Sequence, residues 1–475
     1  MSSDPFTTAP REPATGADAL TQPACGGLKP AGKIWTVGTL TYTGATLVPL
    51  FFWLLFGDFA WSMRDRSIAQ MAAWYLNHLQ VPNIVFGLLI STFPVFVGLV
   101  LGPIISVKSD RHRGKWGRRI PFLLVTTPLA AFGMLGLAAT PMIARWMHGF
   151  FPRESEMLVS LVCFGVFWTA FEVASIAASA VFGGLINDVV PAPLLGRFYG
   201  MFRAISLIDG MVFNYWLMGR VPEHFSLIMS GVGLLYGTSF MWVCFKVREG
   251  TYPPPSKLGE LEAVGGFVSG TKAYIRECFS KPYYILVFLM LMSAALAFAP
   301  INTFALPYAL HLGLTEDTYG KCIALTFTIS LLLAWPIGWL ADKFHPLRMA
   351  IATMLAYSAV SILGALYANT PRTFMVCWIL HGVLSGCYFT GAASLALRLF
   401  PREKFAQFQS AASIVASPAQ MALAPLLGMI IDRTHDTYRY TFVGGTVLSF
   451  IAALSALWVY RHFLRLGGHQ SYVAP

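Results

Sequence analysis

The chain has 475 residues, of which 56% are hydrophobic and only 12% are charged, and its mean hydropathy is +0.62. A soluble chain of this length would carry about twice that share of charge, so the composition excludes an ordinary soluble protein. The net charge of +11 does not require a nucleic-acid partner. Most Lys and Arg fall on one side of the predicted membrane helices, as expected of a cytoplasmic face.

Residues 1–33 form a polar segment rich in Pro, Gly, Ala and Thr. They have too little apolar surface to fold and lack the pattern of a signal peptide, so we expect a disordered tail. Apolar stretches of about 20 residues, the length that crosses hydrocarbon, then recur along the chain. They predict an all-α polytopic membrane protein with twelve transmembrane helices in two pseudo-symmetric six-helix halves. The predicted helices are 48–76, 84–105, 120–140, 157–185, 199–219, 226–246, 284–305, 319–341, 347–367, 373–398, 405–431 and 440–461.

The polar segment 247–283 separates the N-terminal half, 34–246, from the C-terminal half, 284–461. Consecutive prolines forbid a helix at its start, and 258–278 then has the amphipathic pattern of a helix on a membrane surface. The even number of helices and the basic loops place this segment and both termini, including the tail 462–475, in the cytoplasm. The absence of an N-glycosylation sequon is typical of a bacterial protein, so we expect the inner (cytoplasmic) membrane.

A charged loop follows an apolar helix twice, at nearly half-chain separation. The first copy contains Asp110 and the pair Arg118-Arg119, and the second contains Asp342-Lys343. The two aspartates lie 232 residues apart (342 − 110). Such a repeat is typical of secondary transporters, whose halves rock about a central site. Charge clusters at helix ends can lock one conformation and release another, so we expect a cytoplasmic gate here. The alternative is a pair of basic loops that only set the topology.

The first loop carries a family resemblance. Ser109-Asp110-Arg111, followed by Gly117-Arg118-Arg119-Ile120-Pro121-Phe122, resembles the loop between the second and third helices of major facilitator superfamily sugar transporters. The most similar groups are the sucrose–proton symporter-like proteins and the glycoside–pentoside–hexuronide symporters. Gly57-Asp58-Phe59, the string from Asn187 to Pro191 with Gly196-Arg197, and the string from Gly338 to Phe344 resemble further family patterns, and the resemblance spans about 34–461. The expected gate residues are Asp110, Arg111, Arg118, Arg119, Asp188, Arg197, Asp342 and Lys343.

The first helix can be placed in two ways. Hydropathy alone centres it on 40–62 and leaves Arg64, Asp65 and Arg66 in an outer loop. The resemblance favours 48–76, which places these three charges deep in the membrane. Each charge costs a few kcal/mol there unless it is paired or hydrated, and neighbouring opposite charges that face a wet cavity reduce the cost.

Ion coupling needs a group that changes charge inside the membrane, and the first half supplies four carboxylates. Glu172 and Asp209 lie midway along the fourth and fifth helices, where the alternative is a static hydrogen bond between helices. Asp58 and Asp65 are seven residues apart and share one face of the first helix. The resemblance implies a coupling carboxylate in the fourth helix, as in the sucrose group. The predicted second helix has no charged residue, unlike that of the melibiose-permease branch, which favours protons over sodium.

Arginines in the same region could bind a substrate carboxylate or phosphate, or could simply neutralise the nearby acids. The second half has no carboxylate away from its helix ends, so we expect it to help bind a neutral sugar through aromatic faces and amides. His381 is interpreted as a packing residue rather than a proton relay. For each aromatic candidate the alternative is plain packing. The substrate-binding candidates are Arg64, Arg66, Trp61, Trp168, Asn214, Asn302, Tyr308 and Tyr388.

These observations favour a proton-coupled symporter for a small glycoside or oligosaccharide. The sequence shows no nucleophile–base pair and no metal-ligand cluster, so no enzymatic activity, cofactor or metal is expected. The expected partners are the sugar, protons and the lipid bilayer, with no nucleic acid and a monomeric chain. Two alternatives stay open: a carrier of an anionic sugar or organic anion that uses Arg64 and Arg66, and a membrane assembly factor with a transporter fold. The retained membrane carboxylates argue against the second.

Overall fold

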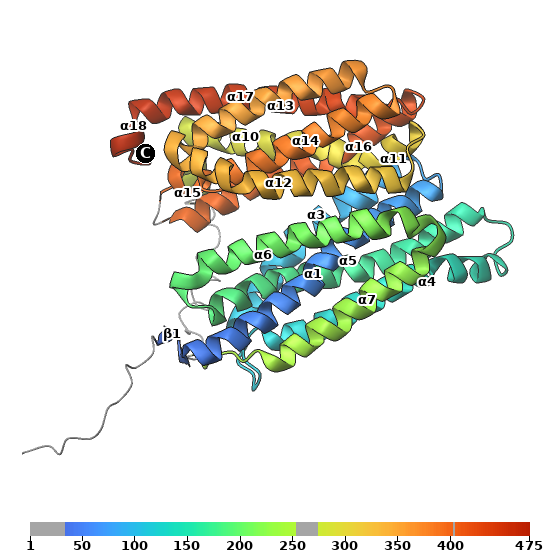
Figure 1. Ribbon diagram of the computed structural model, residues 1–475, viewed down its shortest axis with the longest axis horizontal. Helices are drawn as coiled ribbons and strands as arrows, with labels where there is room; N and C mark the ends of the chain where they lie inside the picture. Colours follow the sequence, from blue (N-terminus) through green and yellow to red (C-terminus); the bar gives the residue numbers. More distant parts are fainter. Residues whose placement is uncertain (1–33, 253–273, 402–403) are drawn as a thin grey trace, which may run out of the picture.

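The computed structural model describes residues 34–252, 274–401 and 404–475. In these ranges eleven helical segments are long and apolar enough to cross a membrane. One of them, 192–246, has 55 residues and is bent near His224, so it supplies two crossings and gives the predicted twelve. Figure 1 shows two layers of helices, with the N half in blue and green and the C half in yellow to red.

The helices of the N half begin and end close to the predicted bounds, and each predicted span lies inside an observed one. The observed helices are longer because they include turns at their ends that are more polar than the apolar centres from which the spans were predicted. The elements are α1 (Gly44–His78), α2 (Asn83–Gly87), the π-helical turn η1 (Leu88–Thr92), α3 (Phe93–Arg111), α4 (Ile120–His148), α5 (Glu156–Val189), α6 (Ala192–Val212), the π-helical turn η2 (Phe213–Leu217), the 3₁₀ turn η3 (Met218–Arg220) and α7 (Val221–Lys246).

The C half repeats the pattern with two interruptions. A break at Phe298 divides its first crossing, and residues 392–394 divide its fourth. Its elements are α10 (Pro282–Ala297), α11 (Ala299–His311), α12 (Glu316–Phe344), α13 (Pro346–Tyr367), α14 (Pro371–Gly391), α15 (Leu395–Leu399), α16 (Phe405–Arg433), α17 (Tyr440–Arg465) and α18 (Gly468–Ser471).

Three terminal and linker features complete the chain. A short hairpin that the sequence did not predict joins β1 (Trp35–Val37) to β2 (Leu40–Tyr42) in antiparallel register. The predicted tail 1–33 lies outside the described residues, as does most of the predicted surface helix 258–278. The described residues that follow, 274–279, are helical. The segment 462–475, predicted as a tail, instead continues α17 to Arg465 and then packs against the C half through Tyr472.

The two halves meet at the end of the bundle where α1 ends and α2 begins, which we name the far end. The N-terminus of α2 faces Asp432 of α16, whose oxygens accept from the backbone N–H groups of Asn83 at 2.9 Å and Ile84 at 3.0 Å. The Asn83 amide also donates to Asp432 and Asp436, at 2.8 and 3.1 Å. A Cβ at Gly428 would lie 2.3 Å from the carbonyl oxygen of Asn83, so only glycine permits this approach. The carboxylate caps a helix across the interface and closes the far end.

The opposite end, where α7 ends and α10 begins, is named the linker end, and here the halves separate. On α12, Thr328 contacts Met211 of α6, with Oγ1 to Sδ at 3.1 Å. Trp335 and Trp339 follow seven and eleven residues later, so they share the face that looks toward the N half. Their exposed fractions are nevertheless 80% and 51%. The faces of the two halves are therefore in contact at Thr328 and at the far end, whereas the Trp335 and Trp339 side chains nearer the linker end are exposed.

We expect Asp432→Asn to loosen the far end. Asparagine keeps one acceptor oxygen but loses the negative charge at the α2 N-terminus, and a lost charge-assisted hydrogen bond costs about 1.5–3 kcal/mol. Pulsed EPR between spin labels at positions 149 and 369, in a cysteine-free background, should show more of the longer distances. Glu223→Gln, at a side chain that is 80% exposed at the same end, is the control and should change nothing. An unchanged distribution in Asp432→Asn would contradict the assignment of this carboxylate as a closure contact.

Candidate functional site

Arg64 and Asp65 form an ion pair at the middle of α1. The guanidinium donates from Nε and Nη2 to Asp65 Oδ1, at 3.0 and 2.6 Å. It lies between the rings of Trp61 and Tyr236, at 3.9 and 4.7 Å from their centroids, and Arg64 is only 1% exposed. The Asp65 side chain is 51% exposed. The pair therefore connects the core of the N half with open space beside α1, and the aromatic rings stabilise the cation.

A small cavity beside this pair contains the predicted polar stripe of α5. Its volume is about 180 Å³, and Glu172, Ser175 and Ser179 line it together with Arg64 and Asp65. Glu172 is close enough to attract Arg64 and to be repelled by Asp65. Two carboxylates therefore compete for one guanidinium, and the charge on either acid influences the pairing of the other.

Arg66 leaves α1 on the other side and reaches the contact between the halves. Its Nε and Nη2 donate to Ser206 Oγ on α6, at 3.2 and 2.9 Å. Its guanidinium carbon lies 5.1 Å from the ring centroid of Phe327 on α12. Arg203 and Asp209 are close enough to repel and attract it, respectively. Arg66 is thus the one predicted substrate-binding cation that the structure places against both halves, in the part of the chain that it describes.

Asp209 is buried at this contact, and both of its carboxylate oxygens lack a hydrogen-bond partner among the described residues. Asp58 on α1 is buried nearby, with one oxygen unpartnered, and the charges of the two acids would repel each other. Buried polar atoms in folded proteins almost always have partners, so two such acids mark a functional candidate. Of the four predicted coupling carboxylates, Asp65 and Glu172 line the cavity beside Arg64, whereas Asp58 and Asp209 do not. Asp58 is close enough to be repelled by the charges of both Asp209 and Asp65.

Two of the N-half helices that pack against the C half contain a π-helical turn. η1 precedes α3 and packs on α16, while η2 follows α6 and packs on α12. Asn214, a predicted substrate-binding residue, lies in η2 and donates to the Gly210 carbonyl at 2.8 Å. Its Oδ1 is buried and has no hydrogen-bond partner in the described part of the chain. π turns widen a helix locally and are frequent at functional sites.

Three predicted substrate-binding aromatics lie within the protein core instead. Trp168 is 1% exposed and donates from Nε1 to the Leu89 carbonyl at 3.0 Å. Tyr308 donates to the Ala368 carbonyl at 2.5 Å. Trp61 is buried against Phe182, Tyr236 and Phe240 and beneath Arg64. The structure thus places these polar aromatics in packing contacts, the alternative that the sequence left open.

The C half has a neutral polar network at the break between α10 and α11. His381 on α14 is fully buried, and its ring nitrogens lie 2.8 Å from Tyr357 Oη and 3.0 Å from Asn302 Oδ1. Asn302 is exposed, whereas Tyr388 is buried against Phe298. His381 therefore holds Asn302, a predicted substrate-binding amide, in a fixed orientation from behind.

Four predicted gate residues meet at the linker end of the N half. Arg118 donates from Nη2 and Nε to Asp188, at 2.5 and 2.8 Å, and Arg119 Nε donates to the same carboxylate at 3.2 Å. Arg119 also pairs with Asp110 and donates to Ser109 Oγ at 2.6 Å. The hydrogen bonds to Asp188 raise the pKa of Arg118 above its ordinary value. The loop is thus a connected network rather than a set of solvated charges.

Glu249, which the sequence did not single out, completes this network. Its Oε2 accepts from the backbone N–H of Arg118 at 2.9 Å, and its Oε1 accepts from those of Arg119 and Ile120, at 2.8 and 2.7 Å. The carboxylate thereby caps the N-terminus of α4. Gly117 makes room for it, because its φ is +100° and a Cβ would lie 2.6 Å from Glu249 Cδ. The only signal in the sequence was an acid just after the sixth predicted helix.

The second-half loop forms a weaker cluster. Asp342 pairs with Arg398 at 3.4 Å, and both side chains are exposed. Lys343 Nζ lies 4.8 Å from the ring centroid of Trp339. Arg111 and Arg197 are exposed, and we find no ion pair for either among the described residues. The two loops are alike in sequence, but the structure concentrates their ionic contacts in the first.

Comparison with known proteins agrees with this architecture. Residues 285–466 match the model of the Major Facilitator Superfamily. The riboflavin transporter MCH5 of Saccharomyces cerevisiae is 23% identical over 340 residues; the match covers 70% of this chain but only 58% of that protein's length.

Solved structures are similar over nearly the whole fold. A D-xylose–proton symporter has a TM-score of 0.62 at 15% identity, with 87% of this chain and 97% of that chain covered. An inward-facing, unoccupied bacterial homologue of the human lysosomal transporter Spinster has a TM-score of 0.61 at 15% identity, with 88% and 97% covered. The C half of the chain thus matches the Major Facilitator Superfamily model, and the fold as a whole is similar to those of these solved membrane transporters.

Proposed function

We propose that the chain is a proton-coupled symporter of a small glycoside or oligosaccharide that works by alternating access. The observation that carries the proposal is Asp209, whose carboxylate is buried without a partner beside the contact between α6 and α12. An unpaired charge there would cost several kcal/mol, whereas a protonated acid would not. Because this contact changes whenever the halves rock, the proton on Asp209 responds to the transport cycle.

Arg66 supplies the charge that would favour proton release from Asp209. In the structure it donates to Ser206 and lies against Phe327 of the other half. Movement of α12 removes Phe327 and frees the guanidinium to pair with Asp209. Asp58 then shares or receives the proton, because the charges of the two acids repel each other.

Glu172 and Asp65 form a second coupling system around Arg64. Only Asp65 is paired with the guanidinium in the structure, and Glu172 faces the same cavity. An exchange of partner would leave Asp65 to take up a proton from the open side. This system lies within the N half. Its protonation would therefore depend on how α1 packs against α5 and not on the contact between the halves.

Asn302 and its supporting network are the proposed sugar contacts of the C half. The amide is exposed and oriented by His381, and it lies in a half that is neutral near its centre. Sugars need donors and acceptors for hydroxyls and flat apolar faces for ring C–H groups. The likeness to a D-xylose–proton symporter supports this substrate class. Tyr388 is too buried to contact a substrate in this conformation.

An anionic substrate is the second candidate function. Arg66 and Arg203 are close enough to repel each other, and neither has an ion pair with a described residue. Two such cations beside the cleft would bind a carboxylate or phosphate group. Arg64 is a poorer candidate, because it is buried and already paired.

The linker end is the proposed cytoplasmic end. The basic loops gather there, which also places both termini in the cytoplasm, and the inner membrane of a bacterium is the proposed location for a monomeric chain. The cleft open at this end then corresponds to an inward-facing state. We assign the domains as 34–246 and 284–461, joined by the linker 247–283, with the network of Asp110, Arg118, Arg119 and Asp188 as part of the gate.

We expect Asp209→Asn to abolish concentrative uptake while exchange continues. Asparagine mimics the protonated acid but cannot release a proton, so substrate binding and rocking survive and coupling does not. The measurement is uptake of a labelled panel of glycosides, uronates and other organic anions into proteoliposomes under an imposed inward proton gradient. Glu172→Gln should lower concentrative uptake less, since Glu172 lies away from the contact between the halves. Glu154→Gln, in an exposed loop, is the matched control.

The panel separates the candidate functions. Gradient-driven accumulation of a glycoside, lost in Asp209→Asn only, supports the proposal. Uptake of uronates or other anions instead, lost in Arg66→Gln, replaces it with the anion carrier. If no solute moves in protein that is folded by circular dichroism, the assembly-factor alternative takes its place. Concentrative uptake by Asp209→Asn equal to that of the unmodified chain would remove Asp209 from the coupling mechanism.

We expect Glu249→Ala to destabilise the gate network more than any change in the second loop. Three backbone N–H groups at the start of α4 would lose their acceptor, at a cost of roughly 1–3 kcal/mol. Asp342→Ala removes an exposed pair worth at most about 1 kcal/mol. Thermal unfolding followed by tryptophan fluorescence should therefore show a clearly lower midpoint for Glu249→Ala and little change for Asp342→Ala. Equal midpoints for the two variants would argue against a capping role for Glu249.

A further inference from the structure

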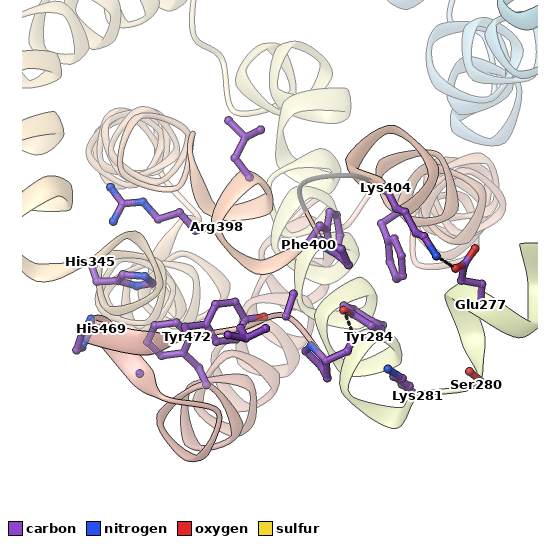
Figure 2. Close-up of a pocket in the computed structure, with 18 of the residues that line it drawn as sticks. Glu277, Ser280, Lys281, Tyr284, His345, Arg398, Phe400, Lys404, His469 and Tyr472 are labelled. Carbon is purple, nitrogen blue, oxygen red and sulfur yellow. Dashed lines mark hydrogen bonds and ion pairs between the residues drawn. The ribbon is translucent and has the colours of Figure 1, made fainter. Parts of the chain in front are cut away.

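A larger cavity lies at the linker end of the C half, away from the carboxylates of the N half. Its volume is about 1520 Å³, and its walls come from the start of α10, the end of α15, the start of α16 and the segment after α17. Figure 2 shows Tyr472 crossing the middle of this cavity, with Lys281 and Lys404 on one side and His345 and His469 on the other. Neither the coupling groups nor the gate network of the N half line it.

The lining of this cavity is strongly basic. Four cationic side chains, Arg276, Lys281, Arg398 and Lys404, face one acid, Glu277. Glu277 is already paired with Lys404, and Arg398 pairs with Asp342. Arg276 and Lys281 therefore lie at the rim without an ion pair to a described residue. The carboxyl group of Pro475 also lines the cavity, but the four cationic side chains outnumber the two acidic groups, which favours an anion.

His345 neither adds to nor reduces the positive charge of the cavity, because its ring is neutral at neutral pH. His345 is 8% exposed, and its Nδ1 accepts from the Leu347 N–H at 3.2 Å, which requires that nitrogen to be unprotonated. Burial, with the nearby charges of His469, Arg398 and Arg348, lowers the pKa of His345 to about 4. At neutral pH the His345 ring is uncharged, so it forms part of the cavity wall without adding a positive charge that would attract an anion.

The floor of the cavity is apolar and aromatic. Phe400, Phe408 and Phe463 contribute buried rings, and the Tyr284 ring packs at a tilt of 51° against Phe408, with centroids 4.4 Å apart. The cavity therefore combines a cationic rim with an apolar floor. A small inorganic anion would contact only the cationic rim, whereas an amphiphile with an anionic head group would contact the rim with its head group and the apolar floor with its apolar part.

The C-terminal segment closes one side of the cavity. Tyr472 donates to the Leu399 carbonyl at 2.8 Å and lies 2.9 Å from Tyr283 Oη. Tyr284 donates to the Pro475 carbonyl at 2.5 Å. These contacts connect α10, α15 and the end of the chain, so the wall is built by side chains and not left by a loose tail.

We propose that this cavity binds the phosphate group of an anionic amphiphile, with Arg276 and Lys281 contacting the phosphate and the aromatic floor contacting the apolar part. Guanidinium and ammonium groups are the usual partners of phosphate, and basic pockets between membrane helices bind lipid head groups. The same chemistry could come from a membrane phospholipid or from a soluble phosphate ester. The proposal is independent of the transported substrate. A bound amphiphile would bridge α10, α16 and the C-terminal segment and stabilise this open conformation.

The test uses the full chain in neutral detergent and measures binding by thermophoresis. The probes are short-chain phosphatidylglycerol, which is anionic, phosphatidylcholine of equal chain length, which is zwitterionic, and glycerol phosphate, which has no apolar part. The variant is Arg276→Gln with Lys281→Gln. Its matched control is Lys246→Gln with Arg461→Gln, which removes the same charge at the same end outside the cavity. Arg276→Lys with Lys281→Arg keeps the charge and should keep binding.

We expect phosphatidylglycerol to bind the unmodified chain about thirtyfold more tightly than it binds the double Gln variant, since each basic group near an anionic head group contributes about 1 kcal/mol. The control should differ by less than about threefold, and the charge-preserving variant should recover affinity. If glycerol phosphate bound as tightly as phosphatidylglycerol, the apolar part of the ligand would not contribute to binding. The ligand would then be a soluble phosphate ester and not an amphiphile. Equal affinity of the unmodified chain and the double Gln variant, or equal binding of phosphatidylcholine, would overturn the proposal.

Discussion

The low dielectric of the membrane interior is the constraint on which the rest of this structure depends, because every charge inside it must be paired, hydrated or neutralised. The N half meets this constraint in three different ways along a single helix and its neighbours. Arg64 is paired and enclosed by aromatic rings, Arg66 is hydrogen-bonded and lies against the other half, and Asp209 has no hydrogen-bond partner among the residues that the structure describes. The described C half is neutral near its centre and satisfies its buried histidine with hydrogen bonds instead. One half therefore carries groups that can change charge, and the other offers a fixed polar surface.

The contact between the halves is built so that it can separate. At the far end it includes the Asp432 carboxylate, which caps a helix of the other half. Hydrogen bonds from Asn83 to Asp436 and from Trp74 to Glu316 also join the halves there. In the middle, α12 and α16 pack against two helices that each contain a π turn, and the contacts include Arg66 with Phe327 and Thr328 with Met211. A π turn already deviates from the regular hydrogen-bond ladder, so a small shift in register is less costly there than in a continuous helix. Closure at one end and opening at the other follow from this geometry.

The sequence predicted the twelve crossings well, because apolar length is imposed by the membrane and can be read locally. It missed the hairpin 35–42, which is short and depends on contacts with the rest of the N half. Candidate residues were predicted by type and depth, and those are not sufficient to decide which way a side chain points. Trp168 and Tyr308, for example, lie in the core, because one hydrogen bond to a backbone carbonyl satisfies the indole N–H or the phenol O–H. Glu249 could not be found, because its partners are backbone N–H groups about 130 residues earlier, and backbone donors leave no signature in a sequence.

The positions of Arg64 and Arg66 explain why one helix can connect both carboxylate systems. Two residues apart on a helix, they leave α1 on roughly opposite sides, so Arg64 points toward α5 and Arg66 toward α6. A rotation of α1 that brings one guanidinium closer to its acid would move the other away from its own. The acids on the two sides therefore need not be charged at the same time, which keeps the number of unpaired charges in the membrane small throughout a cycle. In the proposed mechanism, coupling would then be a property of α1 as a rigid element, with Asp209 and Glu172 as its two alternating acceptors.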